Sequence, residues 1–299
     1  MKKLNISQVD TIFANGSYPI EFLLYYKDKL KTKKIRSALT KLASAFWPIF
    51  GEYDAGIIYF DKYSEQECFD EDVIEQEFDR EMTNQNIYEK YCRINPSDMK
   101  KLFFLKVIQY KNGTVLIPKM NHLAGDGHSY FYFLSALAAL AQVTYVPFKK
   151  NLIRALYKPH HHRTILKEFQ FEQIGLKKPL GYEEKLVIEF EEISKIAVKN
   201  IIKNIRSDLR QQVSSNDILS TMIIKKTIEI QKDYFGDDFQ LTIPIDVRRY
   251  VKEYGLKYFG NGIMFHVVDF KTKDIEKASV HELAIEIRKS MPVVTKASY

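Results

Sequence analysis

A histidine, an aspartate and two glycines stand close together in the segment 121–127, directly after a run of apolar residues. A histidine at the end of a rigid strand has a fixed ring. Because its ordinary pKa is roughly 6.5, its neutral imidazole can take a proton from a hydroxyl or an amine near neutral pH. Gly125 and Gly127 allow a sharp bend and a close approach of the backbone to a ligand. Asp126 has two candidate roles, to orient the ring or to pair with a cation and fix the bend. The segment therefore indicates general-base chemistry, with His122 and Asp126 as the candidate catalytic residues.

Two other interpretations of these residues stay open. A histidine after a strand is commonly a hydrogen-bonded structural residue. His122, Asp126 and His128 can also be drawn as a three-ligand metal site. No further histidine or carboxylate cluster nearby in the sequence completes such a site, so no metal is expected.

Hydrophobic periodicity and turn residues predict the elements that must position this segment. A strand at 103–110, an Asn-Gly turn at 111–114 and a strand at 115–120 lead to His122. The positive φ that Asn-Gly tolerates favours a tight hairpin here. An apolar helix follows at 129–141, and its pattern predicts burial on most of its sides.

Helices and strands mix in both halves of the chain, without the regular alternation of a parallel barrel. The other expected elements are a helix at 34–47 ended by Pro48, a strand at 56–60, a strand at 185–190, a helix through Ile193 and Ile205, a helix capped by residues 215–217, strands at 240–248 and 263–267, and a last helix at 275–290. Nine acidic residues between Glu65 and Glu81 predict an exposed helix face. We expect an α/β protein of two domains, 1–150 and 185–299, joined by a crossover linker at 151–184.

Length and composition narrow the function classes. The chain has 299 residues, of which 45% are hydrophobic, and this suits two domains with real cores. The net charge of +7 comes without an arginine-rich arm, so nucleic-acid binding is not expected. No signal peptide and no apolar run long enough for a membrane span are found, which predicts a cytoplasmic protein. Cys68 and Cys92 are too few for a disulfide framework. His160–His162, with Lys158 and Arg163, fit either contacts to the phosphates of a ligand or a solvated loop, and the solvated loop is the expected one.

The segment 122–127 resembles the His-x-x-x-Asp-Gly signature of the BAHD acyltransferases. That family shares a superfamily with chloramphenicol acetyltransferase and the condensation domains of peptide synthetases. Three further matches follow the family's order over nearly the whole chain. Residues 5–10 resemble Leu-Ser-x-x-Asp, residues 35–51 resemble the early helix that closes with Tyr-Pro-Leu-Ala-Gly, and residues 246–248 with 258–261 resemble Asp-x-Arg and Tyr-Phe-Gly-Asn.

The resemblance implies two chloramphenicol-acetyltransferase-like domains, α+β two-layer sandwiches with mixed sheets, that meet at a solvent channel. It implies no bound cofactor, with acyl-CoA as cosubstrate and a small alcohol or amine as acceptor. His122 would deprotonate the acceptor, which attacks the thioester directly, without an acyl-enzyme. Asp126 would pair with Arg248. The residues implied to support or line the channel are Gly127, Asp246, Arg248, Tyr258, Gly260 and Asn261.

The chain departs from the family's pattern at two places. Asn121 stands where condensation domains have a first histidine, which argues against that branch. The later Asp-Phe-Gly-Trp-Gly segment is absent, and Trp47 is the only tryptophan. We expect either a truncated product or a short variant with an incomplete second sheet, whose open edge invites pairing with another chain. The competing hypothesis is therefore a catalytically degenerate relative that binds a ligand or forms an oligomer.

Overall fold

The structure is a computed structural model. It describes residues 1–7, 9–13, 19–92, 101–142, 158–161, 163, 192–230 and 236–292. The described residues fall into two compact units, the first within Met1–Phe169 and Asp246–Ile263, and the second within Gln170–Ile245 and Met264–Ser298. Residues 246–263 thus belong to the first unit, although they lie within the range expected for the second domain. The strand expected at 185–190 and most of the expected linker lie outside the described residues.

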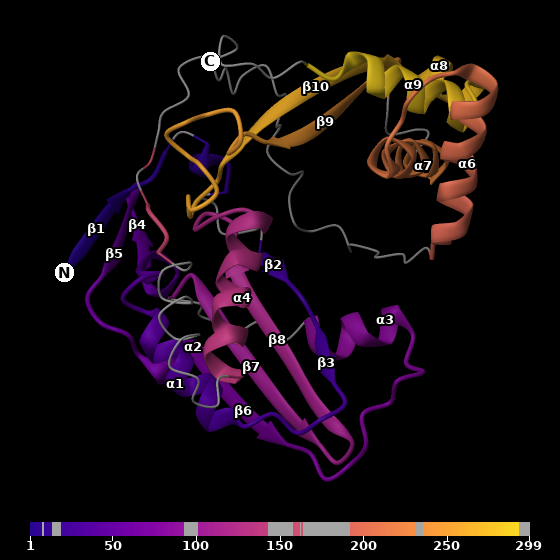
Figure 1. Cartoon of the computed structure of the whole chain (residues 1–299). Coiled ribbons are helices and arrows are strands. Elements are labelled where there is room, and N and C mark those ends of the chain that lie inside the picture. Colours follow the sequence, from indigo (N-terminus) through magenta and orange to yellow (C-terminus); the bar gives the residue numbers. More distant parts are fainter. Residues whose placement is uncertain are drawn as a thin grey trace. The chain divides into compact units, whose positions relative to one another are not determined.

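A mixed five-stranded sheet forms the centre of the first unit, in the order β2-β8-β7-β6 with β3 also paired to β8 (Figure 1). Its strands are β2 (Pro19–Glu21), β3 (Leu24–Tyr26), β6 (Phe69–Val73), β7 (Phe103–Tyr110) and β8 (Gly113–Asn121). β6 runs parallel to β7, and the other pairs are antiparallel. The mixed sheet agrees with the mixed sheets that the resemblance implies.

The smaller elements of the first unit lie before and between these strands. They are β1 (Lys2–Asn5), β4 (Glu52–Asp54) and β5 (Ile57–Phe60), which form a separate sheet in the order β1-β5-β4, with η1 (Asp10–Phe13), α3 (Asn84–Ile87) and the π-helical η3 (Tyr88–Cys92). The strand predicted at 56–60 is confirmed as β5.

The β7–β8 hairpin exists, but its turn is not the predicted one. Tyr110 pairs with Gly113, so Lys111 and Asn112 form the turn, and neither Asn112 nor Gly113 has a positive φ. Asn112 instead binds the backbone of Phe78, which donates to Oδ1 at 2.8 Å and accepts from Nδ2 at 3.0 Å. Gly113 is needed for space, because a Cβ there would lie 2.2 Å from the carbonyl oxygen of Tyr26.

The acidic run at 65–81 is not an exposed helix face, and that prediction was wrong. Only α2 (Glu65–Cys68) is helical, and the chain continues directly as strand β6. The reason is the basic residue on the neighbouring strand: Lys106 Nζ lies 2.5 Å from Asp70 and 2.7 Å from Asp72. Because this lysine compensates both carboxylates, the acidic segment can pair in a sheet.

Helix α1 (Thr32–Leu42) is shorter than the predicted helix. Pro48 lies in the 3-10 helix η2 (Trp47–Phe50), since proline cannot continue an α-helix. Four apolar residues at helical spacing in the predicted helix are all buried, three of them in α1 and the fourth just beyond it: Ile35, Leu39, Leu42 and Phe46.

Helix α4 (Gly127–Gln142) follows the His122 segment and lies along β7 and β8 (Figure 1). It packs on the sheet through Phe133, whose ring centroid is 4.9 Å from that of Phe103, and against α1. The exposed residues of α4 are Phe131, Ser135 and Ala138, which lie on one face, and the other described side chains of the helix are buried or half-buried. The prediction of burial on most sides is therefore confirmed, with Phe131 on the exposed side.

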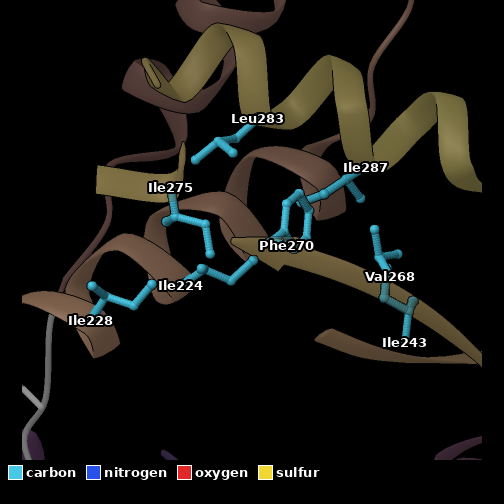
Figure 2. Packing of buried hydrophobic residues seen from close by; sticks show 8 residues of the cluster. All are labelled: Ile224, Ile228, Ile243, Val268, Phe270, Ile275, Leu283 and Ile287. Atoms are coloured by element: carbon cyan, nitrogen blue, oxygen red, sulfur yellow. The ribbon is translucent and has the colours of Figure 1, made fainter. Parts of the chain in front are cut away.

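The second unit packs helices against the two-stranded sheet of β9 and β10 (Figure 1). Its elements are α6 (Lys195–Leu209), α7 (Ser215–Ile230), β9 (Asp238–Asp246), β10 (Ile263–Lys271), α8 (Thr272–Lys277) and α9 (Val280–Ser290). Figure 2 shows its apolar core, in which α7, α8 and α9 direct isoleucine and leucine side chains toward Phe270 of β10. Burial of these side chains stabilises the unit by the hydrophobic effect.

The single helix predicted at 275–290 is in fact two. Ser279 interrupts it as the N-cap of α9: its hydroxyl accepts from the Glu282 N–H, and its own N–H donates to the Glu282 carboxylate at 2.8 Å. Such a reciprocal capping box starts a new helix. β9 likewise ends at Asp246, two residues before its predicted end, and the Val247 N–H donates to the Gly262 carbonyl oxygen at 2.9 Å.

Candidate active site

His122 is the first residue after β8 and begins a tight bend. The Ala124 N–H donates to the Asn121 carbonyl at 2.9 Å, and the Gly125 N–H donates to the His122 carbonyl at 3.2 Å. The Asn121 side chain also accepts from the Leu123 N–H at 3.0 Å. The bend is therefore closed by its own backbone before α4 begins.

The His122 ring is stacked on Phe13, with ring centroids 3.8 Å apart and an angle of 21° between the planes. Its Nδ1 atom is buried without a hydrogen-bond partner among the described residues. Burial lowers the pKa of His122 below the ordinary value of 6.5, although its own backbone carbonyl and Asp126 act in the opposite direction. The imidazole is consequently neutral at pH 7 and able to accept a proton.

Asp126 and Arg248 form the buried ion pair that the resemblance implies. Arg248 Nη1 and Nη2 each lie 2.8 Å from one carboxylate oxygen of Asp126, and the side chains are 0% and 6% exposed. The carboxylate also accepts from the Ser129 N–H at 3.0 Å and from the Gly262 N–H at 2.9 Å. Asp126 is thus the N-cap of α4 as well as the partner of Arg248.

The Tyr258–Asn261 segment is held against the start of α4. Arg248 donates to the carbonyl oxygens of Gly260 at 2.8 Å and Tyr258 at 3.3 Å. Ser129 Oγ donates to the Gly260 carbonyl at 2.8 Å and lies 3.0 Å from the Gly260 nitrogen. Sequence reasoning missed Ser129, because its partner Gly260 lies 131 residues further along the chain.

Asn261 connects His122 to the start of the chain. Its Nδ2 atom donates to the His122 carbonyl oxygen at 2.9 Å and to Asp10 Oδ1 at 2.7 Å. Asp10 is completely buried and accepts from the backbone N–H and the hydroxyl of Ser7 at 2.7 and 2.8 Å. The structure therefore brings three of the four matching parts of the sequence together near His122: residues 5–10, residues 122–127, and residues 246–248 with 258–261.

Two of the predicted site residues take little part in this network. Asp246 is 48% exposed on its side chain, and its Oδ1 accepts from the Arg248 N–H at 2.9 Å and from Nη1 at 3.2 Å. Gly127 is the first residue of α4, and a Cβ there would meet no atom within 4 Å.

The histidine run is not a solvated loop where the structure describes it. His161 Nε2 lies 2.7 Å from the Ala45 carbonyl, and its ring makes edge contacts with Trp47 and Phe259. Burial lowers the pKa of His161 to about 4. His160 forms a bridge with Tyr258. The solvated-loop prediction failed because the aromatic rings that cover His161 come from segments about a hundred residues away.

The three residues of the metal alternative serve other contacts. Both oxygens of Asp126 are engaged by Arg248, and His128 Nε2 lies 3.2 Å from the Leu256 carbonyl. In the described part of the chain, no group of three His, Cys, Asp or Glu residues is placed to hold a metal ion. Among these same residues, no helix is both long and apolar enough to cross a membrane.

Comparison with solved structures shows the same fold in several enzymes. TRI101 of F. graminearum, complexed with coenzyme A and deoxynivalenol, superposes with a TM-score of 0.68 at 14% identity, over 100% of this chain and 76% of that one. TRI101 of F. sporotrichioides, complexed with coenzyme A and T-2, gives 0.63 at 13% identity, over 96% and 73%. Vinorine synthase gives 0.69 at 15% identity, over 98% and 71%. The expected α/β fold with mixed sheets is thereby confirmed.

Sequence comparison gives a second result. No curated protein sequence matches this chain significantly. The sequence profile described as the transferase family matches residues 1–299. Because this match spans the entire chain, the chain belongs to the transferase family.

Proposed function

We propose that this chain transfers an acyl group from acyl-CoA to a hydroxyl or an amine of a small molecule, with His122 as the general base. The observation that carries the proposal is the state of His122 itself. Its imidazole is stacked on Phe13 and is kept neutral by burial. Hydrogen bonds join the segment that carries it to Asp10, to Arg248 and to the Tyr258–Asn261 turn. A general base needs this combination of fixed position and available lone pair.

In the proposed reaction the acyl group passes directly from CoA to the acceptor, without an acyl-enzyme. The His122 imidazole takes the proton of the acceptor O–H or N–H while the oxygen or nitrogen attacks the thioester carbonyl carbon. The tetrahedral intermediate collapses with cleavage of the C–S bond, and the thiolate of CoA takes the proton from the imidazolium. The products are the acylated acceptor and CoA thiol. Because Nδ1 is buried, Nε2 is the nitrogen assigned to the proton transfer.

The comparisons support this assignment of substrates. The TRI101 structures hold coenzyme A together with T-2 or deoxynivalenol, so the same fold accommodates a CoA molecule and a small-molecule ligand. The family match over residues 1–299 supports a transferase activity.

The other site residues are assigned supporting roles. Asp126 holds α4 and Arg248, and therefore acts on the bend that carries His122, with no direct part in the proton transfer. Asn261 holds the His122 backbone. Tyr258 and Gly260 supply carbonyl oxygens to Arg248, and we propose that their turn supports the substrate channel.

The test is an acyl-transfer assay on the purified chain. A panel of acyl-CoAs and of alcohol and amine acceptors is screened by release of free CoA thiol. His122→Ala is expected to lower kcat by about 10²- to 10⁴-fold, which is the range for loss of a general base. The matched control is His281→Ala in α9, which is expected to leave the rate unchanged.

Two results decide against the proposal. An unchanged rate in His122→Ala refutes the assignment of the base. If the unaltered chain releases no thiol with any donor and shows no CoA binding by calorimetry, the degenerate, ligand-binding relative becomes the better account, and light scattering then tests for an oligomer.

A further inference from the structure

Arg163 is a buried arginine directly after the histidine run, where the sequence predicted a solvated loop. Its side chain is 5% exposed. Nη1 donates to the Tyr258 hydroxyl at 3.0 Å and to the Phe259 carbonyl at 2.8 Å, and Nη2 donates to the Ala124 carbonyl at 3.3 Å. One guanidinium thus connects the bend after His122 to the Tyr258–Asn261 turn.

The charge of Arg163 is compensated by Asp10. Nε lies 3.3 Å from Asp10 Oδ2, close enough for an ion pair although outside hydrogen-bond geometry. A buried guanidinium needs such a partner, because an unpaired charge in the interior is costly. Arg163 and Arg248 are therefore both paired with a buried aspartate, and both contact the Tyr258–Asn261 turn.

Gly260 shows that the fold makes room for Arg163. A Cβ at this position would lie 1.4 Å from Arg163 Nη1. No L side chain fits there while the guanidinium keeps its place. The glycine of the Tyr-Phe-Gly-Asn segment is consequently explained by the arginine that passes over it.

Two short paths lead from Arg163 to His122. The first runs through Asp10, whose Oδ1 accepts from Asn261 Nδ2, the same atom that donates to the His122 carbonyl. The second runs through the Ala124 carbonyl, two residues beyond His122 in the same bend. Displacing Arg163 would release both at once.

We propose that Arg163 is a positioning residue for the general base: it fastens the bend at Ala124, the turn at Phe259 and the carboxylate of Asp10 in one arrangement and so fixes the place of His122. This inference rests on the proposed acyl transfer for its kinetic consequence. Its structural consequence, a change at the His122 ring, is measurable without any substrate.

Arg163→Gln and Arg163→Lys test the proposal. The glutamine variant removes the charge. The lysine variant keeps the charge but replaces the planar fork by one ammonium, which cannot reach the same three partners. Arg206→Gln, an exposed arginine of α6, is the matched control. For each variant kcat and KM are measured, the thermal midpoint is recorded, and the pKa of His122 is followed by NMR, its signal among the seven histidines being assigned from its loss in His122→Asn.

Arg163→Gln is expected to lower kcat by roughly 10- to 100-fold while KM for acyl-CoA changes by less than about threefold, because a small misplacement of a catalytic group acts on the chemical step. The pKa of His122 is expected to rise, since Asp10 loses its cation. Arg163→Lys should show a smaller fall in kcat and a smaller rise in the His122 pKa. If the glutamine variant does not fold, the lysine variant is used in its place.

Unchanged kcat, KM and His122 pKa, with only a lower thermal midpoint, would overturn the proposal and leave Arg163 a purely structural residue. If the unaltered protein transfers no acyl group, the proposed function fails by itself. The NMR titration then decides separately whether Arg163 positions His122.

Discussion

At the level of single residues, the acidity of His122 is governed by loss of water. Phe13 covers one face of the ring, and Nδ1 is enclosed. Asp126, which a catalytic relay would direct at the ring, gives both oxygens to Arg248. Burial therefore outweighs the nearby carboxylates, and the pKa moves down.

The pH dependence of the proposed activity follows from this shift. The base must be neutral, so kcat/KM should rise with pH up to the His122 pKa and then level off. Because that pKa is lowered from 6.5, the midpoint of the rise should lie below pH 6.5. Rates between pH 5 and 8 check this. Phe13→Ala exposes the His122 ring to water and should raise the pH midpoint of the acid limb. Phe131→Ala, on the exposed side of α4, should leave that midpoint unchanged. An acid limb centred above 6.5 in the unaltered protein contradicts the interpretation.

The two aspartates that contact Arg248 offer a matched comparison of burial. Asp126→Asn leaves the guanidinium buried beside a neutral amide and should cost about 3–5 kcal/mol of unfolding free energy. Asp246→Asn removes a half-exposed partner and should cost less than about 1 kcal/mol. Denaturant titrations of both variants measure the difference. Equal losses would mean that Asp126 is not the main partner of Arg248.

At the level of elements, the two glycines beside Asp126 prove to have different tasks. A Cβ on Gly125 would lie 2.8 Å from the Ser129 Cβ and 3.4 Å from the Gly260 Cα, so its small size is required for packing. Gly127 has open space around it and no positive φ. The sequence suggested that both glycines allow a close approach of the backbone. In the structure only Gly125 lies where a side chain has no room.

Alanine substitutions separate these tasks. Gly125→Ala should destabilise the protein by about 1–3 kcal/mol through overpacking. Gly127→Ala, in the first turn of α4, should be neutral or stabilise by up to about 1 kcal/mol, because alanine restricts the unfolded chain. Thermal midpoints of the two variants test the contrast, and a loss in Gly127→Ala as large as that in Gly125→Ala would contradict it.

Local patterns predicted the elements around His122 well, and distant contacts explain the failures. The β7–β8 hairpin and the buried face of α1 follow from periodicity within a few residues. The capping box at Ser279 is equally local and was readable in the sequence. The burial of His161 and Arg163 was not, because their partners come from far along the chain.

The site shows the same division. His122 was found from its own neighbours in the sequence. The residues that hold its segment in place are Asp10, Arg163 and Arg248, and each lies more than forty residues away along the chain. Only the resemblance to a family related Asp126 to Arg248. Nothing local in the sequence related Arg163 to Asp10, because a single arginine in a stretch without periodicity has no pattern to identify it.

At the level of the whole molecule, the two compact units repeat one arrangement. In the first unit, Ser7 and Asp10 form a cap that pairs with Arg163. In the second, the Ser214 hydroxyl donates to Asp217 at 2.9 Å, and Arg288 Nη2 lies 2.6 Å from the same carboxylate. The repeated use of a Ser-x-x-Asp cap with a distant arginine favours the proposal of two related domains.

The stability of the protein should depend on pH through His161. Its pKa is about 4 in the folded state and 6.5 ordinarily, so the unfolded chain binds an extra proton between these values. Unfolding free energy should therefore fall as pH drops from 6.5 to 4, by up to about 3 kcal/mol from this group. In His161→Gln, which keeps a donor for Ala45, this part of the loss should disappear. Denaturant titrations at pH 7 and pH 5 check it, with His281→Gln as control. An identical pH dependence in both variants would exclude His161 as the source.

The order of residues in the first unit has a consequence for synthesis on the ribosome. Residues 246–263 belong to that unit but emerge after residues 170–245, which build the second. Until they emerge, Asp126 lacks Arg248 and the His122 carbonyl lacks Asn261. The nascent chain must therefore hold its first unit unfinished while most of the second is being made, and the contacts that hold the His122 bend are complete only when translation has passed Asn261.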